Sequence, residues 1–143
     1  MVTEMLTYSD VQTFLTARLT ALGYGSTKPM PLLDPGPATL AKLQKKTPDA
    51  MVLSSVGNGV GLTTEGAYDR PFITTRVLGP QNDYAGAETL AQDLDRIWLA
   101  VTNQAVGNTR VLYVTRNAPP QLVDFDADDR YHFQTTYIAE ATR

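Results

Sequence analysis

Four aspartates, an arginine and the only histidine of the chain lie within nine residues near its C-terminus. The segment PPQLVDFDADDRYHFQ (119–134) contains Asp124, Asp126, Asp128, Asp129, Arg130 and His132. Carboxylates spaced two residues apart are typical of calcium loops, and a histidine beside carboxylates is typical of metal-dependent hydrolases and nucleases. The same residues are also typical of a solvated acidic turn that leads into a strand.

A calcium loop of the EF-hand type needs oxygen ligands at positions 1, 3 and 5, glycine at position 6 and a bidentate glutamate at position 12. Counted from Asp124, the ligands Asp126 and Asp128 fit, but position 6 is Asp129 and position 12 is Thr135. The pattern therefore fails at positions 6 and 12, where calcium binding makes the strictest demands on geometry. We therefore favour an acidic turn, and a looser cation site stays open as the alternative.

His132 alternates with Tyr131 and Phe133 in a strand-like pattern. Because successive side chains of a strand point to opposite faces, we expect His132 on the other face from these aromatic residues, without a catalytic partner. A structural histidine is the favoured interpretation. A small metal-dependent hydrolase or nuclease that uses the Asp124–His132 segment is the alternative from a different class of function.

The glycine-rich stretch GNGVG (57–61) follows an apolar run and invites a phosphate-loop interpretation. Such a loop needs a helix N-terminus directly after the glycines, whereas LTTEGAYDRPF follows here, with Pro71 and no helical stripe. No serine has a nucleophile-elbow context. From the residues alone we predict a non-enzymatic domain without a metal or other cofactor.

The composition predicts one folded domain over 1–143, since 43% of the residues are hydrophobic and 19% are charged. The net charge of −3 disfavours binding to nucleic acid, and the lack of cysteine removes disulfides and thiolate chemistry. The N-terminus lacks the pattern of a secretory signal, and no apolar run is long enough to span a membrane. We expect a protein made in the cytoplasm.

Hydrophobic periodicity and turn residues predict the elements of the fold. A proline-rich passage, KPMPLLDPGP, is expected to contribute an edge segment at most. The other expected elements are a helix at 10–22 with a Ser9–Gln12 capping box, a short helix at 38–46, strands at 50–56 and 72–79, a helix of about 18 to 20 residues capped by Asn82 or Asp83 and reaching Val101, and strands at 110–115 and 130–140. These elements predict an α+β fold with two layers, an about four-stranded, mostly antiparallel sheet and helices packed on one face.

Five segments carry a resemblance that spans nearly the whole chain. They are VQTFLTARLTALG, MVLSSVGNGVG, RPFITTRVLG, YAGAETLAQDLDRIW and APPQLVDFDADDRYHFQTTYIAE. In this order and spacing they resemble the tail terminator proteins of long-tailed bacteriophages, a group also labelled tail completion or minor capsid proteins. In the family pattern a glycine often precedes the arginine of the last segment, where this chain has Asp129.

The resemblance implies a non-catalytic subunit of a homo-oligomeric ring, usually of six copies, at the head-proximal end of the tail tube. Such a ring ends polymerisation of the tube protein and contacts the head-completion or neck protein, while DNA passes through without specific binding. The implied location is the neck end of the virion tail, assembled in the host cytoplasm and away from membranes. A neck connector or a tail tube subunit is the alternative within virion structure.

A closed ring needs two different patches on each subunit. We expect the acidic turn on one edge to meet basic groups of a neighbour. The candidate subunit contacts are Asp126, Asp128, Asp129, Arg130, Arg70 and Arg76. The candidate loop facing the tube or the lumen contains Gly57, Asn58, Gly59, Gly61, Glu65 and Gly66.

Overall fold

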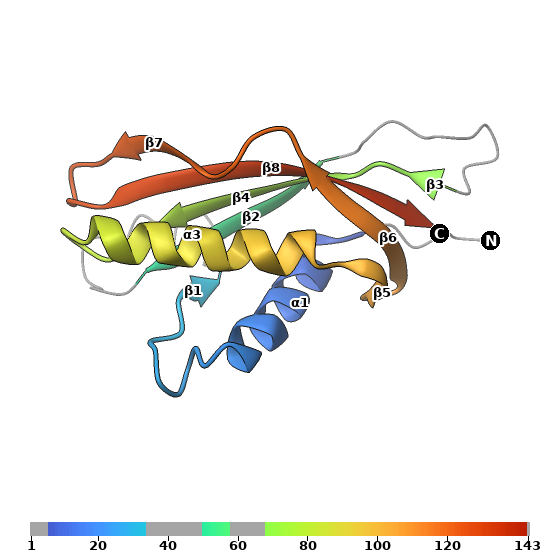
Figure 1. Ribbon diagram of the computed structural model, residues 1–143, viewed down its shortest axis with the longest axis horizontal. Helices are drawn as coiled ribbons and strands as arrows, with labels where there is room; N and C mark the ends of the chain where they lie inside the picture. The colour runs from blue at the N-terminus through green and yellow to red at the C-terminus, as the bar shows by residue number, and fades with distance from the viewer. Residues whose placement is uncertain (1–5, 34–49, 58–67, 143) are drawn as a thin grey trace.

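The computed structural model describes residues 6–33, 50–57 and 68–142 of the chain (Figure 1). Strands predominate in these residues, and two helices lie beneath the sheet in the view of Figure 1. In chain order the elements are α1 (Tyr8–Ala21), β1 (Leu32–Leu33), β2 (Met51–Gly57), β3 (Tyr68–Asp69), β4 (Phe72–Leu78), α3 (Tyr84–Leu99), β5 (Thr102–Val106), β6 (Thr109–Arg116), β7 (Gln121–Phe125) and β8 (Tyr131–Thr142).

The 12-residue strand β8 is the centre of the sheet. It pairs antiparallel with β4 and β3 on one side and with β6 and β7 on the other. β3 and β4 follow the same register along β8, with Tyr68 opposite Thr142 and Phe72 opposite Ile138. One long strand therefore connects almost all parts of the sheet.

The predicted two-layer fold with a sheet of about four strands is wrong. The described residues form eight strands in one sheet, with the main order β1-β2-β4-β8-β6-β5. The sheet is mixed, because β1 runs parallel to β2, and it curls strongly into a half-barrel. β1 at the edge confirms that the proline-rich passage contributes an edge segment.

The four predicted strands correspond to β2, β4, β6 and β8, and the error comes from strands that periodicity did not reveal. β5 has the largely polar sequence TNQAV, and β7 directly follows the Pro-Pro pair in a segment interpreted as a turn. Two β-bulges, between Val111 and Tyr113 and between Leu122 and Asp124, interrupt the pairing with β8. Bulges increase local twist, which accounts for part of the curl.

Both long helices are present with small shifts at their ends. α1 begins after Thr7, which forms a capping box with Asp10, so the predicted Ser9–Gln12 box is wrong. α3 is capped by Asp83, one of the two predicted caps, and its 16 residues fall short of the expected length. Its N-terminal end lies below the β7–β8 hairpin in Figure 1, and its other end lies near β5.

Trp98 lies in the hydrophobic core between the helices and the sheet and is fully buried. Its ring contacts Phe14 of α1 at 5.1 Å and Tyr137 of β8 at 6.1 Å between centroids. Ile73 and Val77 of β4 belong to the same core, as the alternation of that strand requires. Trp98 therefore joins both helices to the central strand of the sheet.

The predicted short helix at 38–46 lies outside the described residues. In the described part of the chain, no helix is both long and apolar enough to cross a membrane.

Candidate interaction surface at the acidic turn

Asp126 organises the turn between β7 and β8. Its Oδ1 atom accepts hydrogen bonds from the backbone N–H groups of Asp128 (2.8 Å) and Arg130 (3.1 Å), and its own N–H donates to the carbonyl of Arg130 at 3.0 Å. Asp129 has a φ of +62°, in the left-handed region that glycine adopts most easily. The turn therefore has the backbone conformation that a glycine before Arg130 would also adopt.

His132 contacts Asp126 directly, which corrects the expectation that strand alternation leaves the histidine without such a partner. Nε2 of His132 lies 2.5 Å from Oδ2 of Asp126. On its other side, Nδ1 accepts a hydrogen bond of 3.0 Å from Nε of Arg76. These partners assign the proton of the neutral ring to Nε2, because the arginine can only donate.

The pKa of Asp126 is lowered by this environment. Partial burial acts in the opposite direction and is the largest single influence, since it disfavours the charged carboxylate. The hydrogen bonds from His132 and from the backbone N–H groups of Arg130 and Asp128 together outweigh it. The folded structure therefore holds Asp126 as a carboxylate.

The three arginines predicted to contact neighbouring subunits have partners within the chain. Arg76 reaches Gln134 at 3.4 Å and Asp124 at 3.9 Å in addition to His132. Nε of Arg70 forms an ion pair of 2.6 Å with Glu140.

Arg130 is fully buried, and its Nη1 donates to the carbonyl of Gly79 at 2.8 Å. Burial corrects its assignment as a subunit contact, because a neighbouring subunit cannot reach the side chain in this structure. The contact roles of Asp126, Asp128 and Asp129 stay a prediction, and Asp129 is exposed.

The arrangement around His132 is suited to holding the hairpin together. A general base needs a ring nitrogen that can reach a substrate, but both nitrogens of His132 are engaged and the residue is only 6% exposed. Within residues 6–33, 50–57 and 68–142, no group of three or more histidine, cysteine, aspartate or glutamate side chains is placed to hold a metal ion.

Gly57 ends β2 and is exposed, and a Cβ on it would meet only ordinary contacts with Phe72. The other residues of the candidate loop, Asn58, Gly59, Gly61, Glu65 and Gly66, lie outside the described residues.

An exposed apolar surface next to the turn was not predicted. Phe125 contacts Tyr131 across the turn at 4.5 Å between ring centroids, and Tyr131 contacts Tyr84 of α3 edge-on at 5.1 Å. We call the aromatic patch the group Tyr84, Leu122, Phe125 and Tyr131. Its first three members are 43–49% exposed.

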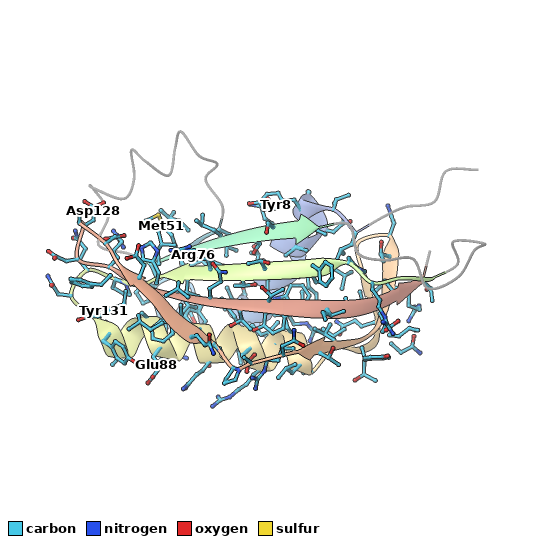
Figure 2. All side chains as sticks on the ribbon, turned by 90° about the horizontal axis from the view of Figure 1, so that it is seen from above. Tyr8, Met51, Arg76, Glu88, Asp128 and Tyr131 are labelled. Atoms are coloured by element: carbon cyan, nitrogen blue, oxygen red, sulfur yellow. The ribbon has the colours of Figure 1, made fainter. Side chains whose placement is uncertain are left out.

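Figure 2 shows Tyr131, Asp128 and Glu88 at the same end of the molecule, where β7 joins β8 and α3 begins. The aromatic patch therefore lies beside acidic groups. The sequence signal that could have revealed it is the apolar triplet of Leu122, Val123 and Phe125 within LVDF, next to a turn instead of inside a buried strand.

No family model matches the chain, and no curated protein matches it either.

Proposed function

We propose that this chain is a structural subunit of a bacteriophage tail. Copies of it form a ring at the head-proximal end of the tail tube, end tube polymerisation and join the tail to the head or neck protein. The proposal is supported by the resemblance of the five sequence segments to tail terminator proteins. A ring requires a surface for self-association on each subunit. The exposed aromatic patch is the structural observation that supports such a surface.

Three large apolar side chains that are nearly half exposed and gathered at one end of the molecule are costly to leave in water. Aromatic residues are enriched in the centres of protein–protein interfaces. Phe125, Tyr131 and Tyr84 are held by contacts with one another, so little side-chain freedom is lost on docking. A rigid apolar surface with an acidic border therefore favours assembly.

The geometry around His132 favours a non-catalytic role over the hydrolase alternative. Arg76 and Asp126 are bound to the two ring nitrogens of His132. The carboxylate of Asp126 also accepts a hydrogen bond from the backbone of the turn. The net charge of −3 also suits a ring through which DNA slides without binding to its wall.

The test is electron microscopy of tail tubes assembled from the cognate tube protein, with and without this protein. We expect one ring at a single end of each tube and shorter tubes as its concentration rises. Long cylinders formed by the protein alone would identify a tube subunit instead. Tubes of unchanged length with bare ends would contradict the proposal.

The hydrolase alternative makes a separate prediction. It requires that divalent cations raise the thermal stability of the protein, that Asp128→Ala abolishes this rise, and that turnover is detected. We expect no cation effect in the protein or in the variant, measured as the melting temperature with Mg²⁺, Mn²⁺ or Ca²⁺.

A further inference from the structure

A second exposed apolar surface lies along the C-terminal half of α3, where the end of α1 approaches it. Arg18, Leu22, Asp93, Arg96 and Ile97 are among the residues that line a groove of about 240 Å³ there. Leu22 is 45% exposed and Leu99 is 39% exposed. Leu99 lies three residues after Arg96 and so beside it on the helix surface. We call Arg18, Leu22, Arg96 and Leu99 the basic patch.

The aromatic patch and the basic patch together contain most of the exposed large apolar side chains of the described residues. There are eight such residues, and five of them belong to the two patches. The other three are Phe72, Tyr113 and Val123. Exposed apolar surface is therefore concentrated at two places, as expected for a protein with two docking sites.

The two patches have opposite charge at their borders. The aromatic patch is flanked by the acidic turn, in which Asp129 is exposed, and by Glu88. The basic patch includes Arg18, which is exposed, and Arg96, whose side chain is 78% exposed. The acidic residue of the groove, Asp93, lies 3.8 Å from Arg96 with its side chain only 11% exposed, so the exposed charge is positive. Opposite charges around apolar centres select the correct partner and suppress like-to-like pairing.

The positions of the patches exclude their contact within one copy. Tyr84 begins α3 and Leu99 ends it, so they are separated by the length of a 16-residue helix, about 24 Å. Contact between two different patches is a heterologous interface, which closes into a ring when the rotation between copies allows it. A two-fold axis through either patch would instead place like charges against each other.

We infer that the aromatic patch of one copy docks on the basic patch of the next copy. This inference rests on the proposed function and identifies the two faces of its subunit interface. It replaces Arg70 and Arg76 as the basic partners of the acidic turn, because those two arginines are held by close contacts of 2.6 Å with Glu140 and 3.0 Å with His132. Arg96 is more exposed, and its contact with Asp93 is longer, at 3.8 Å.

The chain contains no cysteine, so introduced cysteines can report the contact without background. Leu122→Cys marks the aromatic patch and Leu22→Cys marks the basic patch. The two single variants, carrying tags of different size, are mixed and treated with a short bismaleimide, alone and with tail tubes. Tyr113→Cys is the matched control, since Tyr113 is 48% exposed and Leu122 is 47% exposed.

We expect cross-linked heterodimers in the mixture of the two patch variants. Either variant alone, or mixed with Tyr113→Cys, should give little product. The double variant should give a ladder of cross-linked oligomers up to the size of the ring. Homodimers of Leu122→Cys alone at equal yield would overturn the inference in favour of a two-fold contact.

Electron microscopy of the tubes, compared with the cross-linking result, distinguishes failure of this inference from failure of the proposed function. Rings at tube ends without cross-links between the two patches would overturn the interface and leave the proposed function standing. A monomer that neither cross-links nor binds tubes would overturn both. As an independent check, Phe125→Asp should reduce the oligomer fraction at least tenfold, whereas Tyr113→Asp should leave it unchanged.

Discussion

His132 and Asp126 are six residues apart in the chain, and their side chains meet with Nε2 of the histidine 2.5 Å from Oδ2 of the aspartate. The β7–β8 pairing brings them together, because Asp124 lies opposite His132 and the turn folds Asp126 back over the start of β8. The carboxylate also accepts hydrogen bonds from the backbone N–H groups of Asp128 and Arg130. Asp126 therefore stabilises the hairpin that carries the aromatic patch.

The replacement Asp126→Asn should lower the free energy of unfolding by about 1–3 kcal/mol at pH 7, because hydrogen bonds to a charged group are lost. The pKa of Asp126 is lowered in the folded state, so its contribution is complete above the ordinary carboxyl pKa and is lost as the pH falls. The difference between protein and variant should therefore shrink below about pH 4, as measured by urea denaturation.

The control for this measurement is Asp129→Asn at the same turn. Asp129 is exposed and has a left-handed φ of +62°, which asparagine tolerates at least as well. Its effect should stay within about 0.5 kcal/mol at both pH values. Equal losses for the two variants would contradict the assigned role of Asp126.

Arg130→Ala should destabilise the fold by about 2–4 kcal/mol, because it leaves the carbonyl of Gly79 without its charged donor and opens a space in a fully buried site. The matched variant Arg110→Ala removes an exposed arginine that binds the carbonyl of Asn103, and should cost less than about 1 kcal/mol. Denaturant unfolding of both variants measures the difference. A small loss for Arg130→Ala would mean that this arginine is accessible in solution.

Gly79→Ala should destabilise the packing of α3 on β4 by about 1–3 kcal/mol. A Cβ at this position would overlap the Cβ of Ala87 and approach its Cα to 3.0 Å. Gly57→Ala is the control, since among the described residues the nearest contact of a Cβ there, apart from its chain neighbours, is Phe72 at 3.8 Å, and its effect should be within about 0.5 kcal/mol. Thermal unfolding of the two variants is sufficient to compare them.

Tyr137→Phe should lower stability by about 1–3 kcal/mol at pH 8, because the tyrosine hydroxyl donates to Asp95 at 2.9 Å in the core. Burial, the charge of Asp95 and this hydrogen bond, in that order, raise the pKa of Tyr137. A raised pKa gives a contribution that is complete below the ordinary tyrosine pKa and is lost as the pH rises above it.

The cost of Tyr137→Phe should therefore decrease above about pH 10. Tyr113→Phe, at an exposed tyrosine of β6, should change stability little at either pH. An unchanged cost of Tyr137→Phe between pH 8 and 11 would contradict the buried hydrogen bond with Asp95.

The sequence by itself was sufficient for the elements with a clear period. The apolar stripe of 84–101 predicted α3, and the alternation around Phe133 predicted β8, because local periodicity follows from the geometry of one helix or one strand. It was insufficient for β5 and β7, whose exposed, mixed sequences leave no such pattern. The number of strands and the curl of the sheet therefore appeared only in three dimensions.

The same division holds for the functional residues. The spacing of the aspartates excluded an EF-hand loop and favoured an acidic turn, and strand alternation favoured a structural histidine. Only the tertiary structure showed that Asp126 binds His132, that Arg130 is buried, and that exposed apolar side chains gather at two places along α3. These properties depend on pairing between distant strands and on which side chains the fold leaves uncovered, and neither is encoded by neighbouring residues in the chain.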